Sequence, residues 1–132
     1  MNHPRIEHVA LWARDLEALC AFYARTFGAT IGPLYENPRK GFKSRFLQFA
    51  SGARLEVMQT SALQPVEHGP GAQRMGLTHL ALALGSEAAV DTLTSSLAQA
   101  GATVLDGPRR TGDGYYESVV LDPEGNRLEL TA

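Results

Sequence analysis

The sequence contains a single cysteine, Cys20, and no hydrophobic run long enough to cross a membrane. One cysteine excludes a disulfide within the chain, so we expect a reducing compartment and interpret Cys20 as a small, buried apolar residue on a helix. A membrane-spanning helix needs about 20 consecutive apolar residues, and the first ten residues, MNHPRIEHVA, lack the apolar core of a signal peptide. We therefore expect a cytoplasmic protein without a membrane partner.

An excess of positive charge is also missing. The chain has 12 Lys and Arg against 14 Asp and Glu, a formal net charge of −2, which disfavours a nucleic-acid partner because such partners usually require a basic face. Hydrophobic residues make up 44% and charged residues 20% of the 132 residues, as in ordinary globular proteins. The composition therefore predicts an ordinary soluble globular protein.

The same order of predicted elements occurs twice along the chain: a strand, a helix and three more strands. In the first copy these are residues 6–13, 15–28, 29–36, 43–51 and 53–60. In the second copy they are residues 77–85, 86–100, 102–108, 115–122 and 126–131. The helices are predicted to be bounded by N-caps at Asp15 and Ser86 and by glycines at Gly28 and Gly101.

This repeat predicts an α+β fold of two βαβββ modules, residues 1–60 and 77–132. The segment 61–76 is rich in Pro and Gly and has little periodicity, so we interpret it as a linker. His79 follows His8 by 71 positions and Glu129 follows Glu56 by 73. A single sheet whose halves merely look alike is the alternative.

Strand parity places one His and one Glu of each module on the same kind of face. Side chains alternate along a strand, so Glu56 points to one face and its neighbours Leu55 and Val57 point to the other. Glu129 and its two flanking leucines are divided between the faces in the same way. On the same face Ala10 follows His8, and Ala81 follows His79, so this face should line a concavity. Each Glu points to water or pairs with Arg54 or Arg127, or else one divalent cation binds both Glu and both His and offsets the cost of burying the charge.

The stretches HVALWARDLEALCAFYARTFG, RLEVM, THLAL and LDPEGNRLEL resemble the vicinal oxygen chelate superfamily, which includes glyoxalase I, bleomycin-resistance proteins and extradiol dioxygenases. The resemblance covers nearly the whole chain. It implies that the two modules form a half-barrel sheet around a metal held by His8, Glu56, His79 and Glu129. It also implies a homodimer, with the site formed within one chain or across two.

The ligand set is similar to that of bacterial-type glyoxalase I. Extradiol dioxygenases resemble this chain but have no ligand at the position of Glu56, and methylmalonyl-CoA epimerase tends to have Gln there. Trp12 and Thr60 stand where glutathione-dependent glyoxalases place Arg and Asn, which argues against glutathione as a cofactor. Oxygen and imidazole ligands suit Zn, Ni, Co, Mn or Fe(II), and the sequence does not choose among them.

These residues predict proton abstraction next to a carbonyl. A substrate with two neighbouring oxygens would lose a carbon-bound proton to Glu129, or to Glu56 as the second candidate base, and pass through an enediolate. Trp12 and Met58 are candidate substrate-binding residues, with core packing as the alternative. Arg109 and Arg110, in a Gly-rich segment 107–116 interpreted as a mobile lid, are candidate anion-binding residues, with solvated surface as the alternative.

The first functional hypothesis is a metal-dependent lyase or isomerase of the lactoylglutathione lyase type, acting on a small α-oxo or α-hydroxycarbonyl compound. A second enzyme hypothesis is an Fe(II)-dependent ring-cleaving dioxygenase or a thioester epimerase. A hypothesis of another class is a binding protein that sequesters a drug or metabolite. Uptake of divalent ions separates the first hypothesis from the last.

Overall fold

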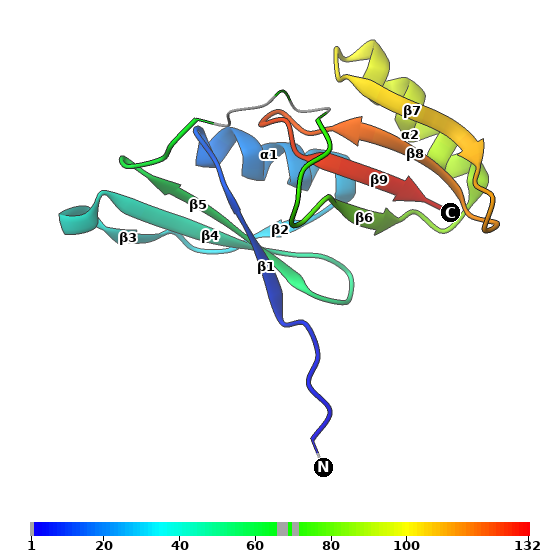
Figure 1. Ribbon diagram of the computed structural model, residues 1–132. Helices are drawn as coiled ribbons and strands as arrows, with labels where there is room; N and C mark the ends of the chain where they lie inside the picture. Colours follow the sequence, from blue (N-terminus) through cyan, green and yellow to red (C-terminus); the bar gives the residue numbers. More distant parts are fainter. Residues whose placement is uncertain (1, 66–68, 70–71) are drawn as a thin grey trace. The chain divides into compact units, whose positions relative to one another are not determined.

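The computed structural model describes residues 2–65, 69 and 72–132. The chain divides into two compact units, residues 1–65 and 66–132, and each unit is described by itself. Part of the predicted linker, residues 66–68 and 70–71, lies outside the described residues. Each unit contains one α-helix and one sheet, and their elements are labelled in Figure 1.

The first unit contains a parallel strand pair extended by antiparallel strands. Its sheet has the order β1-β5-β4-β2, and β3 pairs separately with β4. β1 runs parallel to β5, whereas β4 is antiparallel to β5. The elements are β1 (His8–Trp12), α1 (Leu16–Phe27), β2 (Thr30–Ile31), β3 (Tyr35–Asn37), η1 (Pro38–Lys40), β4 (Phe42–Gln48) and β5 (Arg54–Thr60).

The second unit has the same topology without an extra strand. Its sheet has the order β6-β9-β8-β7, with β6 parallel to β9 and the other neighbours antiparallel. The elements are β6 (His79–Ala83), α2 (Glu87–Gln99), β7 (Val104–Arg110), β8 (Tyr116–Leu121) and β9 (Arg127–Thr131). The predicted α+β class and the two βαβββ modules are confirmed.

One predicted strand is interrupted. Residues 29–36 were expected to form a continuous strand, but the structure has two short strands, β2 and β3, on either side of residues 32–34. Pro33 lacks the N–H that a ladder requires. A Cβ on Gly32 would lie 2.9 Å from the carbonyl oxygen of Phe46, so the chain crosses β4 too closely here for a side chain.

Three of the four helix ends follow the predicted caps, whereas α2 ends with a cap at Ala100, one residue before the predicted Gly101. The Asp15 carboxylate accepts a hydrogen bond from the Ala18 N–H at 3.0 Å, and the Ser86 hydroxyl accepts one from the Ala89 N–H at 3.1 Å. Gly28 ends α1 in the left-handed conformation, with φ of 70°. The Asp15 and Ser86 side chains thereby satisfy backbone N–H groups that have no partner within the first turn of a helix.

Each helix covers one face of its own sheet. α1 packs on β4 and β5, and α2 packs on β7, β8 and β9. The cores contain the predicted inward residues Leu55, Val57, Leu128 and Leu130, all buried. Cys20 is also buried, and burial raises the pKa of its thiol to about 11. No helix in the described part of the chain is long and apolar enough to cross a membrane.

The hairpin between β8 and β9 is held by one buried carboxylate. Asp122 is 4% exposed, and its Oδ1 accepts hydrogen bonds from the backbone N–H groups of Glu124 and Asn126, both at 2.9 Å. Its Oδ2 accepts a third from the Asn126 amide. This explains the DPEGN sequence of the turn and fixes the register that places Glu129.

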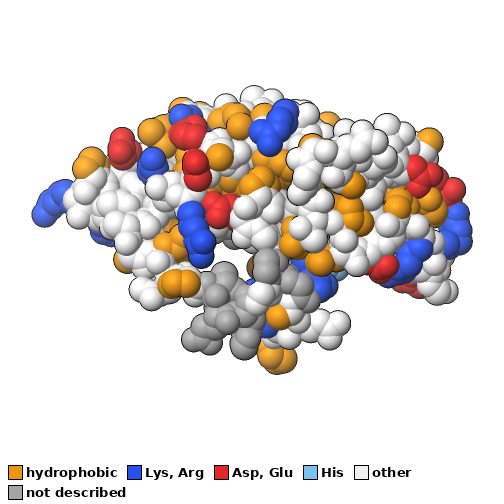
Figure 2. Space-filling model, turned by 90° about the horizontal axis from the view of Figure 1, so that it is seen from above, with side chains coloured by type: hydrophobic (Ala, Val, Ile, Leu, Met, Phe, Trp, Pro, Cys, Tyr) orange, Lys and Arg blue, Asp and Glu red, His pale blue; other side chains and the backbone are white. Residues whose placement is uncertain are grey.

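Charged side chains of both signs are interspersed over the surface shown in Figure 2. This agrees with the nearly balanced composition of 12 basic and 14 acidic residues.

Candidate functional site

In the first unit, His8 and Glu56 lie on the sheet face opposite α1. His8 begins β1, and Glu56 lies in β5 opposite Ala10. Paired residues of neighbouring strands share a face, and the core residues Leu55 and Val57 occupy the other one. The His8 Nε2 lies 3.7 Å from Glu56 Oε1, and both side chains are partly exposed.

The second unit repeats this pair in the same register. His79 begins β6, and Glu129 lies in β9 opposite Ala81, as Glu56 lies opposite Ala10. The His79 Nε2 lies 3.2 Å from Glu129 Oε2. We call the two faces that carry these pairs the His–Glu faces. Their composition, with alanine next to histidine, follows the predicted strand parity.

The His79–Glu129 distance fits two ligands of one metal ion, whereas the His8–Glu56 distance of 3.7 Å is slightly longer than such a pair requires. Metal bonds to imidazole nitrogen and carboxylate oxygen are about 2.0–2.2 Å long, which places cis ligand atoms about 3.0–3.5 Å apart. In the described residues, no group of three or more His, Cys, Asp or Glu is arranged to hold a metal. Each unit therefore offers two ligands, and their convergence on one cation stays a prediction.

Glu7 orients the first histidine. Its Oε1 lies 3.1 Å from His8 Nδ1, so a hydrogen on Nδ1 leaves the lone pair of Nε2 on the side of Glu56. Arg54 pairs with Glu7, with 2.8 Å between its Nε and Glu7 Oε2. This hydrogen bond holds the pKa of Glu7 well below its usual range, at about 2. The guanidinium therefore bonds to Glu7 in place of Glu56.

A carboxylate that the sequence analysis missed lies beside Glu129. Glu117 is on β8, diagonal to Glu129 across the β8–β9 hairpin. A hydrogen bond to Glu129, burial and the like charge of Glu129 together raise the pKa of Glu117 to about 7. Two carboxylates that share a proton form a site where a cation would relieve repulsion. Counting outward from the DPEGN turn would have placed Glu117 on this face.

Arg109 and Arg110 lie on opposite faces of the second sheet. Arg109 pairs in register with Glu117 on the His–Glu face, and its Nε lies 2.6 Å from Asp106 Oδ2. Arg110 pairs in register with Tyr116, lies over its ring and bonds to Glu87 at the start of α2. Both arginines are in strand β7, so residues 107–110 of the segment interpreted as a lid belong to the sheet.

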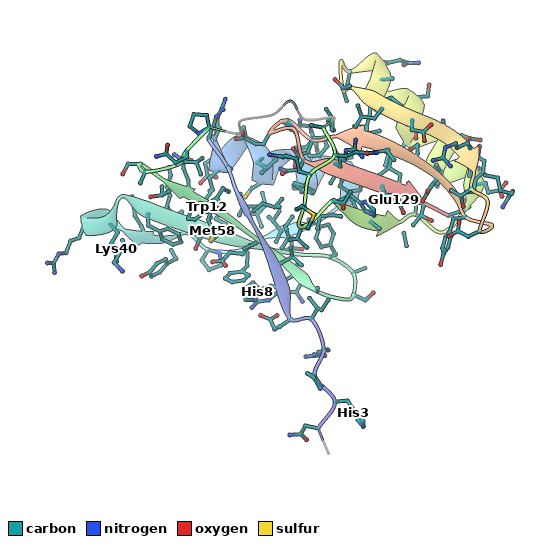
Figure 3. The ribbon with its side chains drawn as sticks, in the orientation of Figure 1. His3, His8, Trp12, Lys40, Met58 and Glu129 are labelled. Carbon is teal, nitrogen blue, oxygen red and sulfur yellow. The ribbon has the colours of Figure 1, made fainter. Side chains whose placement is uncertain are left out.

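Trp12 and Met58 are neighbours on the His–Glu face of the first unit (Figure 3). Trp12 is 48% exposed, and its ring meets the Phe42 ring edge to face with centroids 6.2 Å apart. Core packing, the alternative for Trp12, does not fit this exposure. Whether either residue binds a substrate stays a prediction.

Comparison with known families gives a match over almost the whole chain. The model of the Glyoxalase/Bleomycin resistance protein/Dioxygenase superfamily matches residues 5–130. No curated protein sequence gives a significant match.

Several solved structures share the fold at low sequence identity. A glyoxalase/bleomycin resistance protein/dioxygenase domain from Frankia has a TM-score of 0.80 at 19% identity, with 98% of each chain covered. The trypanothione-dependent glyoxalase I of Leishmania major has a TM-score of 0.75 at 20% identity, over 98% of this chain and 86% of its own. Glyoxalase I of Zea mays has a TM-score of 0.77 at 21% identity over 96% of this chain, which spans only 44% of the maize chain.

Proposed function

This chain belongs to the Glyoxalase/Bleomycin resistance protein/Dioxygenase superfamily, and from that premise we propose that it is a metal-dependent lyase or isomerase. Its substrate is a small molecule with two adjacent oxygens, an α-oxo or α-hydroxycarbonyl compound. The proposed reaction passes through an enediolate, as in glyoxalase-type chemistry. One divalent cation, held by His8, Glu56, His79 and Glu129, is the proposed cofactor.

The observation that carries the proposal is the duplicated His–Glu pair. Ala10 faces Glu56 across two parallel strands, and Ala81 faces Glu129 in the same way. Two partly exposed imidazole–carboxylate pairs at the same register positions supply two neutral nitrogens and two negative oxygens. This set matches the charge of a divalent cation.

The protein groups have separate tasks in this proposal. When bound, the cation would stabilise negative charge that develops on the substrate oxygens. Glu129 accepts the carbon-bound proton and returns it to the neighbouring carbon, and Glu56 is the second candidate for this role. Glu117, whose pKa is raised to about 7 by its hydrogen bond to Glu129, lies where it can exchange a proton with Glu129.

Substrate contacts are proposed for the rest of the His–Glu faces. Trp12 and Met58 provide apolar surface in the first unit. Arg109, on the same face of its sheet as Glu117, is the proposed partner of an anionic group. Arg110 is not proposed for this role, because its guanidinium bonds to Glu87 at the start of α2. Glutathione is not part of the proposal, since Trp12 and Thr60 replace polar residues that would be expected to bind it.

The proposed enzyme is a homodimer that binds neither nucleic acid nor membrane. Light scattering coupled to size-exclusion chromatography gives the molar mass in solution, and a mass near 14.2 kDa would contradict the dimer.

The test combines metal analysis with turnover. Purified protein should take up Zn, Ni, Co, Mn or Fe(II). In the absence of thiols, water adds to the aldehyde of a 2-oxoaldehyde, and the loaded protein should convert this hydrate into the 2-hydroxy acid. Glu129→Gln should keep metal, with lower affinity, and lose about 10²–10⁴-fold in kcat. Full turnover by Glu129→Gln would remove Glu129 from the role of base. Absence of metal uptake would favour a binding protein, and oxygen consumption with catechols would favour a dioxygenase.

A further inference from the structure

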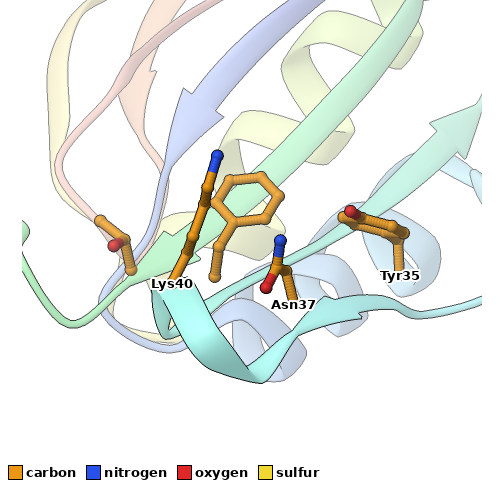
Figure 4. A pocket seen from close by; sticks show the side chains of 5 residues that line it. Tyr35, Asn37 and Lys40 are labelled. Carbon is orange, nitrogen blue, oxygen red and sulfur yellow. The ribbon is translucent and has the colours of Figure 1, made fainter.

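A pocket of about 460 Å³ opens in the first unit, away from the His–Glu pair. Figure 4 shows its walls, which come from β3, η1, β4 and the end of β5. Five side chains line it: Tyr35, Asn37, Lys40, Phe42 and Thr60.

Strand register places three of these side chains in one row. Phe42 lies between Asn37 of β3 and Thr60 of β5, its direct partners on either side. Tyr35 lies in the preceding row, with its ring centroid 6.1 Å from that of Phe42 and the ring planes inclined by 61°. An aromatic wall with polar groups at its edge is the result.

The turn that carries Lys40 is tied to the end of β5. The Ser61 N–H donates to the carbonyl oxygen of Gly41 at 3.3 Å. Gly41 has a φ of 60°, and a Cβ there would lie 2.6 Å from the Ser61 hydroxyl oxygen. The short helix η1 therefore holds Lys40 over the pocket through backbone contacts, without an ion pair.

The polar groups of the pocket have bonding capacity to spare. None of the ion pairs among the described residues involves Lys40. Asn37 stands at the N-cap of η1, but its side chain makes no capping hydrogen bond. The Thr60 hydroxyl oxygen accepts from the Ala62 N–H at 3.4 Å, which leaves its own hydrogen to donate.

The pocket lies on the same sheet face as the His–Glu pair. Glu56, Met58 and Thr60 are every second residue of β5 and point to this face, and Trp12 beside Met58 contacts Phe42 with its ring edge. Thr60 is four positions after Glu56 along β5, a distance of about 13 Å. A single elongated molecule can therefore reach both places.

We propose that this pocket binds an aromatic carboxylate. The ring would lie against Phe42 and Tyr35, where aromatic pairs gain about 0.5–1.5 kcal/mol beyond area burial. The carboxylate would accept hydrogen bonds from the Lys40 ammonium, the Asn37 amide and the Thr60 hydroxyl. Hydrogen bonds with an ionised partner are stronger than those between neutral groups. A single cation in a pocket with an aromatic wall suits a monoanion on a flat ring better than a phosphate, which usually recruits several donors.

This assignment deepens the proposed function and, in its catalytic meaning, rests on it. It makes the substrate an aryl acid whose two adjacent oxygens lie at the other end, about 13 Å from the carboxylate. An anionic group bound by Arg109 would be a second one, close to those two oxygens. Of the four basic residues between positions 36 and 45, only Lys40 lines the pocket. Arg45, by contrast, bonds to Glu17 on α1.

The experiment uses full-length, metal-free protein labelled with ¹⁵N and titrated with benzoate. Amide shifts should concentrate at residues 35–42 and at Thr60, and the dissociation constant should rise at least tenfold in Lys40→Met. Arg39→Met is the matched control, since Arg39 precedes Lys40 in η1 but does not line the pocket, and it should bind benzoate like the wild type.

Two further probes separate ring from charge in the unaltered protein. Cyclohexanecarboxylate keeps the charge and benzamide keeps the ring, so each should bind at least fivefold more weakly than benzoate. Shifts that map outside the pocket, or equal affinity of Lys40→Met and Arg39→Met, would overturn the proposal. The readout involves no metal and no turnover, so failure of the proposed enzyme activity leaves this result intact and failure here leaves that activity intact.

Discussion

The two units place His and Glu at the same register positions but surround them differently. In the first unit the next row across the sheet is Trp12, Met58, Ser44 and Tyr35. The same row in the second unit is Ala83, Thr131, Glu117 and Arg109. One face is therefore aromatic with a buried serine, whereas the other carries an ionic network.

This contrast separates two tasks. The repeated pair needs a fixed spacing of imidazole and carboxylate, and parallel pairing of the first and last strand of each unit provides it. The surrounding row is free to differ, because side chains on an open sheet face do not hold the core together. In the proposed function, the first unit would provide apolar surface for substrate contact, and the second would provide groups that exchange protons and attract anions.

The strongest test removes one histidine from each unit. If the pairs share one cation, His8→Ala and His79→Ala should each weaken metal binding by more than about 100-fold, since even residues that only orient ligands cost 10- to 100-fold. Calorimetric titration of the apo protein with Zn²⁺ measures both. His3→Ala is the control, because His3 lies in the segment before β1 (Figure 3). Loss of binding in only one of the two variants would break the equivalence of the units.

The second test concerns the irregularity that positions Arg109. The register of β7 shifts twice between Val104 and Arg109, and bulges of this kind redirect side chains. Gly107 lies in this stretch with φ of 77°, and a Cβ there would be 2.6 Å from the carbonyl oxygen of Glu117. Gly107→Ala should lower the free energy of unfolding by about 2–4 kcal/mol, from backbone strain and overpacking.

Denaturant unfolding measures this loss. Gly112→Ala is the matched control because a Cβ at Gly112 meets open space, and its effect should stay within about 0.5 kcal/mol. Equal stability of the two variants would show that the bulge does not depend on glycine.

Sequence reasoning predicted the repeat and its capped helices because these depend on local signals. Asp15, Ser86 and Gly28 act within one turn of helix, and period-2 alternation set the faces of Glu56 and Glu129. Glu117 was missed because its importance arises only when two strands are paired across a turn.

The face of each β7 arginine was also beyond the sequence. Simple alternation tells only that Arg109 and Arg110 point apart. Which of them faces Glu117 depends on the bulge around Gly107, which is set by contact with β8. Non-local register of this kind has no signature within one strand.

The third test uses pH, because Glu117 can titrate whereas Ser44, which occupies the same position in the first unit, cannot. The pKa of Glu117 is raised from 4.5 to about 7 by Glu129, with smaller contributions from burial and Asp113 and an opposing one from Arg109. The folded apo protein therefore holds a proton that the unfolded chain releases above pH 4.5. Stability from this group is fully present below pH 4.5 and is lost as pH rises through about 7.

Solvent screening limits this loss to on the order of 1 kcal/mol. Unfolding of metal-free protein at pH 4.5, 6 and 8 measures it, and Glu117→Gln should flatten the difference over this range. A pH dependence that is identical in wild type and Glu117→Gln would place the titrating group elsewhere.

The fourth test separates the two neighbouring arginines of β7. Arg110 pairs with Glu87 at an exposed site, and such pairs contribute about 0–1 kcal/mol. Arg110→Met should therefore lower the free energy of unfolding by less than about 1 kcal/mol and leave substrate affinity unchanged. Arg109 faces Glu117, so Arg109→Met should raise KM for an anionic 2-oxoaldehyde about fivefold, the equivalent of about 1 kcal/mol.

A neutral 2-oxoaldehyde provides the comparison within each variant. Its KM should change little in Arg109→Met, because the lost interaction is with the anionic group and not with the reacting oxygens. Each variant removes one positive charge from the same strand, so a general field effect would act on both alike. The opposite result is a raised KM for the anionic substrate in Arg110→Met alone. It would mean that the anionic group of the substrate contacts the second sheet on its α2 side, on the face opposite Glu117 and Glu129.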